Sequence, residues 1–263
     1  MTTLVAADLD QTLIYSSRAV ERWGGHGAVV TVETYQGSDS AFMTARAAAK
    51  LATLAERGVL VPSTTRTPDQ LARVRVPGPP VRYAVAANGG VLLVDGEVDT
   101  RWSAEVAARV ARVAPLTAMW EHARRYCRPE WTTTLKTACD LFCYAVLDRE
   151  RVPPEFLAQT TVWSAMRGWC VSLQGRKIYW VPQPLTKSAA VAQVAQRAGA
   201  DHVLAAGDSL LDADLLAAAD AGIAARHGEL VASGWRADTV EVTDGSGLAA
   251  GEEIVDWLAA RVA

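Results

Sequence analysis

The sequence predicts an α/β protein in which a Rossmann-like, doubly wound parallel sheet core carries an inserted α+β cap domain. Two observations lead to this prediction. Short apolar runs alternate with helical segments towards both ends of the chain, which is typical of a parallel sheet covered by helices. In the middle of the chain the pattern changes to apolar segments separated by short turns, which indicates a unit of different architecture.

The N-terminal part of the core begins with the apolar run at residues 4–7, which ends at Asp8 as a buried parallel strand would. A helix start is well marked further on, where Thr67 can cap, Pro68 suits the first helical position and Gln70 completes a capping box. In chain order we expect a strand at 4–7, a helix at 41–57, a strand at 59–62, a helix from 68 and a strand at 83–87.

The same alternation returns in the C-terminal part of the chain. Gly199 is placed to end one helix, and the strand that follows it runs into Gly207 and Asp208. We expect helices at 187–198, 212–219 and 252–262, and strands at 202–206, 222–225 and 239–242.

The middle of the chain forms the predicted cap. Proline-rich segments at 76–80 and 182–184 bound it, so we expect the core at 1–80 and 183–263 and the cap at 81–182. The strand within Tyr83–Asn88 can belong to the core sheet instead. Inside the cap we expect helices at 104–113 and 119–126, and strands at 141–147, 161–165, 169–173 and 177–181.

Composition excludes several classes of protein. With 26 basic and 29 acidic residues, the net charge of -3 favours neither a nucleic-acid partner nor an anionic membrane. No apolar run approaches the ~18 residues of a membrane span, so we expect a cytoplasmic protein. The four cysteines form no Cys-x-x-Cys pair and the four histidines are scattered, which argues for reduced thiols and against zinc. The oligomeric state is left open.

Asp8 and Asp10 are the first candidate functional residues. Two carboxylates spaced by two at a strand end can face the same side of the sheet, at the edge where ligands bind in open parallel sheets. Their mutual repulsion is relieved by a hard cation such as Mg²⁺. By itself the pair is also compatible with a solvated loop.

Three further segments follow in order: Thr64 after the second strand, Lys187 at a helix start, and the acidic segment from Gly207 to Asp212. Together with the segment from Asp8 to Leu13, these four segments resemble the motifs of the haloacid dehalogenase-like (HAD) phosphatase superfamily. The position of the insertion resembles that of the superfamily's type-two caps, as in members similar to sugar-phosphate and sucrose phosphatases.

The resemblance implies a role for each motif residue. Asp8 would be the nucleophile and Asp10 the general acid and base. Mg²⁺ would be held by the Asp8 carboxylate, the Asp10 backbone carbonyl and Asp208, with support from Asp212. The phosphate-binding set implied by the resemblance is Thr12, which orders the loop after the nucleophile, Thr64, which hydrogen-bonds the phosphoryl group, and Lys187, which offsets its charge.

Some of these assignments have alternatives. Ser63 or Thr65 can take the place of Thr64, and the two carboxylates of the last motif can simply cap a helix. The sequence also departs from the superfamily pattern at Gln11, Thr65 and Leu211. These departures put the rate and the substrate in doubt more than the reaction type.

The function that the resemblance implies is a Mg²⁺-dependent phosphomonoesterase, working through an aspartyl-phosphate on a small phosphorylated metabolite, with a sugar phosphate favoured. Two alternatives stay open: a phosphomutase of the same superfamily, and a catalytically silent scaffold with a binding or regulatory role.

Several features can select the substrate. Asn88 and Gly89 follow the third strand, and Arg124, Arg125 and Arg128 form a basic cluster that can hold a second anionic group or simply be solvated. Six of the nine tryptophans fall in the cap, where core packing is the more common role and a ligand platform the rarer one. The segment from 12 to 41 is long for a loop, and we expect it to be a flap carrying Trp23, His26 or Tyr35, or else an irregular surface loop.

Overall fold

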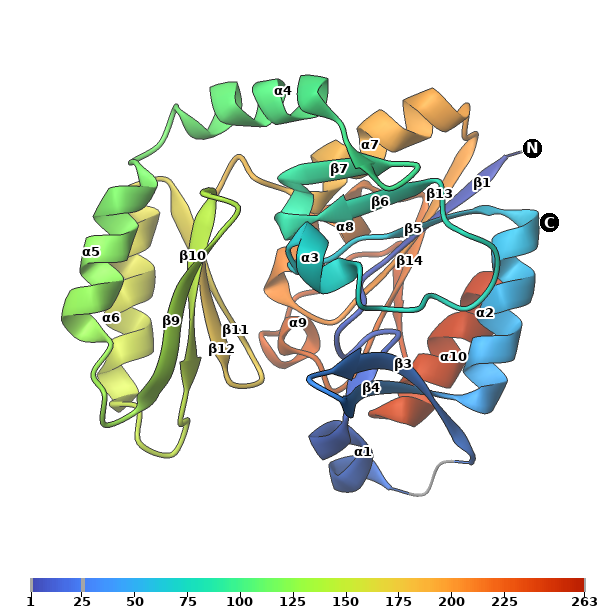
Figure 1. Ribbon diagram of the computed structural model, residues 1–263, viewed down its shortest axis with the longest axis horizontal. Helices are drawn as coiled ribbons and strands as arrows, with labels where there is room; N and C mark the ends of the chain where they lie inside the picture. The colour runs from blue at the N-terminus through green and yellow to red at the C-terminus, as the bar shows by residue number, and fades with distance from the viewer. Residues whose placement is uncertain (1, 25–26, 263) are drawn as a thin grey trace. The chain divides into compact units, whose positions relative to one another are not determined.

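The computed structural model describes residues 2–24 and 27–262 (Figure 1). The chain forms two compact units, the first reaching to Asp99 and resuming at Lys187, and the second spanning Thr100–Thr186. The second unit therefore begins and ends later in the chain than the cap predicted at 81–182. The reason at the first end is that three strands after residue 80 pair with one another inside the first unit.

The first unit is built on a five-stranded parallel sheet, which confirms the prediction of a parallel sheet core. Its strands, in sheet order, are β15 (Val240–Val242), β14 (Ala221–Ala224), β13 (His202–Gly207), β1 (Thr3–Ala7) and β5 (Val59–Pro62). Every residue of β1, which lies between β13 and β5, is buried. This burial explains the uninterrupted apolar run at residues 4–7.

The register of this sheet determines which side chains meet. Ala7 of β1 is paired with Ala206 of β13 on one side and with Pro62 of β5 on the other. The residues that follow these three strands therefore lie together at the carboxyl edge, where ligands bind in open α/β sheets.

Helices accompany the sheet, with α2 and α10 on one side of it in Figure 1 and α7 on the other. The prediction of a helix from residue 41 was wrong at its start, since residues 41–44 belong to a strand and the Thr44 side chain accepts the Ala47 N–H at 3.2 Å to cap the helix there. The helices are α2 (Ala45–Arg57), α3 (Pro68–Leu71), α7 (Lys187–Ala198), α8 (Ala213–Ala218), α9 (Glu229–Ala232) and α10 (Leu248–Ala259), with the 3-10 turn η2 (Leu210–Asp212) before α8.

The long segment after β1 is a hairpin and not an irregular loop. After a short strand at Tyr15–Ser16 comes helix α1 (Ser17–Trp23), and β3 (Val29–Tyr35) and β4 (Ser38–Thr44) then pair with each other. β4 also pairs with the short strand β2 (Tyr15–Ser16). Of the residues named for the flap, Trp23 is the last residue of α1 and Tyr35 the last of β3. His26 lies outside the described residues.

A second hairpin stands beside β5. It consists of β6 (Tyr83–Ala86), β7 (Val91–Val94) and β8 (Glu97–Val98), with the 3-10 turn η1 (Ala87–Gly89) between the first two strands. An isolated parallel bridge joins Ser63 to Val85. The segment 83–88 therefore lies in the first unit, next to β5.

The second unit is an antiparallel sheet with helices. One prediction in it was wrong, because residues 161–165 end a helix; Phe156, Thr160 and Ser164 are its buried residues, and their spacing of four is helical. The unit contains α4 (Thr100–Val110), α5 (Leu116–Tyr126), α6 (Pro154–Ala165), and the sheet β11 (Trp169–Gln174), β12 (Lys177–Pro182), β10 (Phe142–Leu147) and β9 (Thr132–Ala138), in that order.

Tryptophan packing holds the second unit together. Trp102, Trp131, Trp169 and Trp180 are each less than 9% exposed, so four of the six tryptophans in this region are core residues. The indole of Trp180 donates to the Thr160 hydroxyl at 2.9 Å, which satisfies its polar atom inside the core.

Over the described part of the chain, no helix has the length and apolar character needed to cross a membrane.

Candidate active site

Three strand ends bring the predicted site residues together at one edge of the parallel sheet. The Asp8 N–H donates to the Ala206 carbonyl at 2.9 Å, and the Ser63 N–H donates to the Ala7 carbonyl at 2.8 Å. These bonds continue the sheet just past β1 and β5, so that Asp8, Thr64 and Asp208 emerge side by side. All three are nearly inaccessible to solvent.

Asp8, Asp208 and Asp212 form a buried acidic cluster. One carboxylate oxygen from each lies within 4.8 Å of the others. Asp212 is braced by its surroundings, since its Oδ2 accepts the N–H groups of Asp208 and Ser209 at 3.1 and 2.9 Å and the Ser209 hydroxyl at 2.8 Å. Asp212 also caps the turn that follows β13, and its support of a metal ion stays a prediction.

Lys187 completes the cluster as its buried cation. Its Nζ donates to Asp8 at 2.6 Å and to Asp212 at 2.5 Å. Burial favours the neutral amine, but the charges of Asp212 and Asp8 outweigh it and raise the pKa of Lys187 above its ordinary value. A lysine at a helix start interacts unfavourably with the helix dipole. Here the two carboxylates that accept from Lys187 compensate for that interaction.

The cluster carries more negative than positive charge. Three carboxylates face one ammonium group, so the ionised cluster has an excess of two negative charges. Burial, together with the charges of the neighbouring carboxylates, raises the pKa of Asp8 to about 7 in spite of Lys187. The same causes raise the pKa of Asp208 well above its usual range. A divalent cation with oxygen ligands supplies the charge that is lacking, and the donor set of Asp8 and Asp208 fits Mg²⁺.

The loop after Asp8 is held in an unusual conformation. Gln11 has a φ of 65°, a left-handed conformation that favours glycine, the residue usual at this position in the resembled motif. Its N–H donates to the Ile14 carbonyl at 2.8 Å, and its own carbonyl lies 3.0 Å from His227 Nε2. The Thr12 hydroxyl donates to Asp208 at 3.4 Å, and Tyr15 donates to the Thr12 carbonyl at 3.1 Å. These hydrogen bonds hold the loop with Gln11 in the left-handed conformation.

His227 supports this loop as a neutral side chain. The Gly247 N–H donates to its Nδ1 at 3.2 Å, which assigns the ring hydrogen to Nε2 and makes His227 the donor to Gln11. Burial lowers the pKa of His227 to about 4. The aromatic rings of Tyr15 and Trp23 pack beside it.

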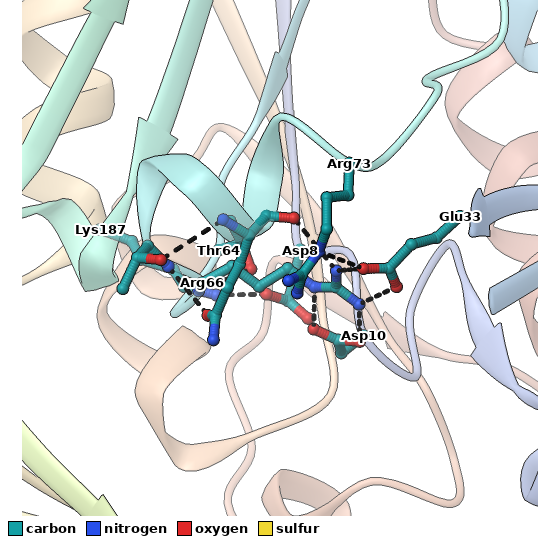
Figure 2. A network of polar contacts seen from close by, with 9 residues as sticks. Asp8, Asp10, Glu33, Thr64, Arg66, Arg73 and Lys187 are labelled. Carbon is teal, nitrogen blue, oxygen red and sulfur yellow. Dashed lines mark hydrogen bonds and ion pairs between the residues drawn. The ribbon is translucent and has the colours of Figure 1, made fainter. Parts of the chain in front are cut away.

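Asp10 belongs to a second polar network, shown in Figure 2. Arg66 donates to both of its oxygens, from Nε at 2.8 Å and from Nη2 at 2.9 Å. The other side of the guanidinium donates to Glu33 at 2.9 and 3.1 Å, and Arg73 donates to Glu33 at 3.1 Å. The Asp10 side chain is still 40% exposed, so its carboxylate is held from one side and open on another.

Ser63, Thr64 and Thr65 are all buried. The Thr64 oxygen accepts the Arg66 N–H at 3.2 Å, which leaves the Thr64 hydroxyl hydrogen available to a ligand. Among the described residues, the buried Ser63 oxygen has no hydrogen-bond partner. Asn88 lies next to Thr64, since its N–H donates to the Thr64 carbonyl at 2.9 Å. The choice among Ser63, Thr64 and Thr65 as the phosphate ligand therefore stays open.

The remaining predicted residues lie elsewhere. Gly89 follows Asn88 in the turn η1, whereas Arg124 and Arg128 are exposed residues of the second unit and their role stays a prediction. Sequence reasoning missed four residues as parts of the site: Glu33, Arg66, Arg73 and His227. The sequence holds no signal for Glu33, because its burial depends on the irregular pairing of β3 with β4.

Comparison with known proteins supports the fold. No family model and no curated protein matches the sequence. Among solved structures, the sucrose-phosphatase from Synechocystis, in complex with sucrose and phosphate, is 17% identical with a TM-score of 0.68 and 98% coverage of both chains. A phosphatase of the HAD superfamily from Bacteroides thetaiotaomicron is 18% identical with a TM-score of 0.54, over 97% of this chain and 96% of that one.

A third similar structure is the C-terminal domain of the C. albicans trehalose-6-phosphate phosphatase, which is 12% identical with a TM-score of 0.58, over 100% of this chain and 94% of that chain. At such identities the likeness establishes the architecture, and it extends over both units of the chain. The resemblance predicted from four motifs is therefore confirmed for the fold: this chain has the fold of the HAD-superfamily phosphatases, with the α+β insertion included.

Proposed function

We propose that this protein is a Mg²⁺-dependent phosphomonoesterase that acts through an aspartyl-phosphate on Asp8. The observation that carries the proposal is the buried cluster of three carboxylates around one lysine, placed at the carboxyl edge of a parallel sheet. A structural ion pair would balance its charges, whereas this cluster has an excess of two negative charges and suits a divalent cation and a phosphate monoester.

In the first step, an Asp8 carboxylate oxygen attacks phosphorus. The new bond joins Asp8 to phosphorus, the bond to the ester oxygen breaks, and Asp10 gives its proton to the departing oxygen. In this proposal Lys187 and Thr64 bind the phosphoryl oxygens, and Lys187 offsets their charge. Bound Mg²⁺, held by Asp8, Asp208 and the Asp10 carbonyl, would neutralise negative charge on the phosphoryl group.

In the second step, water hydrolyses the aspartyl-phosphate. Asp10, now deprotonated, takes a proton from the water as its oxygen bonds to phosphorus, and the bond to Asp8 breaks. Inorganic phosphate leaves, and both aspartates return to their starting states. The half-exposed position of the Asp10 carboxylate supports this role, because a group that exchanges protons with leaving group and water must be accessible to both.

For the substrate we favour a phosphorylated sugar or similar small metabolite. Similar structures include a sucrose-phosphatase and a trehalose-6-phosphate phosphatase, and in this proposal the second unit acts as the cap that selects the substrate. Asn88 and Gly89, together with Arg124 and Arg128, are the proposed specificity residues. The four cysteines are free thiols, in keeping with a cytoplasmic location.

The test is phosphate release from p-nitrophenyl phosphate with and without Mg²⁺. We expect hydrolysis that needs Mg²⁺ and disappears in Asp8→Asn. The matched control is Asp244→Asn, which removes a fully exposed carboxylate and leaves activity unchanged. Hydrolysis that persists in Asp8→Asn would contradict the proposal.

A panel of phosphorylated metabolites then tests the substrate class. Turnover of nucleotides with failure of every sugar phosphate would overturn the sugar assignment. Isomerisation without phosphate release would indicate a mutase.

A further inference from the structure

The hairpin β3–β4 delivers a buried carboxylate to the predicted acid/base residue. In β3, Thr31 is paired with Phe42 and Glu33 with Ala41, so Val32 is an extra residue that forms a β-bulge. Two consecutive side chains, Val32 and Glu33, are both buried, although the residues on either side of them are exposed. In a regular strand successive side chains point to opposite faces, so a strand with one exposed face would bury only one of the two. The bulge is the reason that Glu33 points into the protein.

The hairpin is anchored where Glu33 enters. The Arg75 N–H donates to the Val32 carbonyl at 2.7 Å, and an isolated antiparallel bridge joins Glu33 to Val74. The Arg73 guanidinium lies 4.4 Å from the centre of the Tyr35 ring, in the same hairpin. Backbone and side-chain contacts on both sides of Glu33 thus hold it in place.

Between Glu33 and Asp10 lies one guanidinium whose five N–H donors are all used. Two donate to Asp10, two donate to Glu33, and the fifth points to the Gln70 carbonyl at 3.4 Å. A planar guanidinium with every donor used can adopt few orientations. The orientation of the Asp10 carboxylate is thereby coupled to the position of Glu33.

We propose that Glu33 is a positioning residue for Asp10: the hairpin carries it to the Arg66 guanidinium, whose orientation it fixes and through which it aligns the Asp10 carboxylate for proton transfer. This inference rests on the proposed function. It assigns a task to the long segment after the nucleophile, namely to supply the carboxylate that completes the surroundings of Arg66.

The experiment compares two substrates that differ in their need for acid catalysis. p-Nitrophenyl phosphate has a good leaving group that needs little protonation, whereas phenyl phosphate has a poorer one. We measure kcat/KM, which reports the steps up to leaving-group departure, for wild type and Glu33→Gln. The control is Glu252→Gln, which removes the carboxylate of a surface ion pair with Arg46.

We expect Glu33→Gln to lower kcat/KM about tenfold or more for phenyl phosphate and about threefold or less for p-nitrophenyl phosphate. The control should change neither value. An equal loss on the two substrates would show a merely structural role and overturn the inference, as would the absence of any loss. Failure of the wild type to hydrolyse either substrate would instead remove the proposed function itself, and the inference with it.

A second variant covers the case in which Glu33→Gln does not fold. Arg66→Lys keeps the positive charge but cannot hold both carboxylates through a planar fork. The same substrate-dependent loss is expected, and in the Arg66→Lys background Glu33→Gln should add little further loss. Additive losses in the double variant would show that Glu33 acts independently of Arg66 and would overturn the inference.

Discussion

Two polar networks meet at the loop that follows β1, and they differ in charge balance. The cluster of Asp8, Asp208 and Asp212 has one cation, Lys187. With Asp10 ionised, the network that starts there has two carboxylates and two guanidinium groups, each paired within it. Asp8 and Asp10 are only two residues apart, yet Asp8 belongs to a cluster with too few positive charges to balance its carboxylates, whereas Asp10 belongs to a network whose charges are balanced.

The pKa directions follow from this difference. Burial acts in the same sense on both networks, yet the pKa of Asp8 is raised to about 7. That of Glu33 is lowered, because the hydrogen bonds and charge of Arg66 and the hydrogen bond from Arg73 outweigh its burial. The first network is arranged to receive a cation and a phosphate, and the second is arranged to hold a geometry.

The largest expected effect is a loss of kcat that leaves Mg²⁺ binding intact, which would show that the two networks have different tasks. Asp10→Asn removes the proton donor but none of the carboxylates of the metal cluster. We expect kcat to fall about 10²- to 10⁴-fold, while Mg²⁺ still stabilises the variant against heat. Steady-state kinetics together with thermal unfolding checks this. Loss of the Mg²⁺ effect in Asp10→Asn would show that the two networks are not separate.

The next effect is metal binding by the cluster with excess charge. At a Mg²⁺ concentration 100-fold above its Kd, the free energy of unfolding should rise by about 2.7 kcal/mol. Chemical unfolding with Mg²⁺ and with EDTA measures the difference. It should vanish in Asp208→Asn and persist in Glu33→Gln; an equal response in both variants would contradict the charge argument.

A smaller effect concerns stability without metal. Glu33→Gln leaves Arg73 with a neutral partner and Arg66 with Asp10 as its one remaining carboxylate. We therefore expect the free energy of unfolding to fall by about 2 kcal/mol. The surface variant Glu252→Gln should show a much smaller change, since ion pairs exposed to water contribute little. Denaturant unfolding of both variants in EDTA provides the comparison, and equal losses would remove the distinction.

The smallest effect concerns the loop that joins the networks. The pKa of His227 is about 4 in the folded protein, below its ordinary value of 6.5, so its stabilising contribution is complete above 6.5 and is lost as pH falls towards 4. Between pH 7 and pH 6, wild type should lose somewhat under about 1 kcal/mol more stability than His227→Gln does. Unfolding curves at the two pH values measure this, and equal slopes would contradict the neutral assignment.

Much of the fold and the cluster was predictable because both depend on local patterns. Asp8, Thr64 and Asp208 each follow an apolar strand, and parallel strands align their carboxyl ends. The sequence pattern could not predict Glu33, because its burial depends on an extra residue in β3 that only the pairing with β4 reveals. The helix ending at Ala165 was misread because its apolar stretch, taken alone, fits a strand equally well.

The most direct test of the account is chemical trapping of the phosphorylated aspartate. Wild-type enzyme mixed with substrate and Mg²⁺ is quenched in acid within a turnover and reduced with borohydride, which converts an acyl phosphate to an alcohol. Peptide mass spectrometry should then find homoserine at position 8, and Asp8→Asn should yield none. Phosphate release with unmodified Asp8, or with homoserine at another position, would contradict the assignment of Asp8 as the nucleophile.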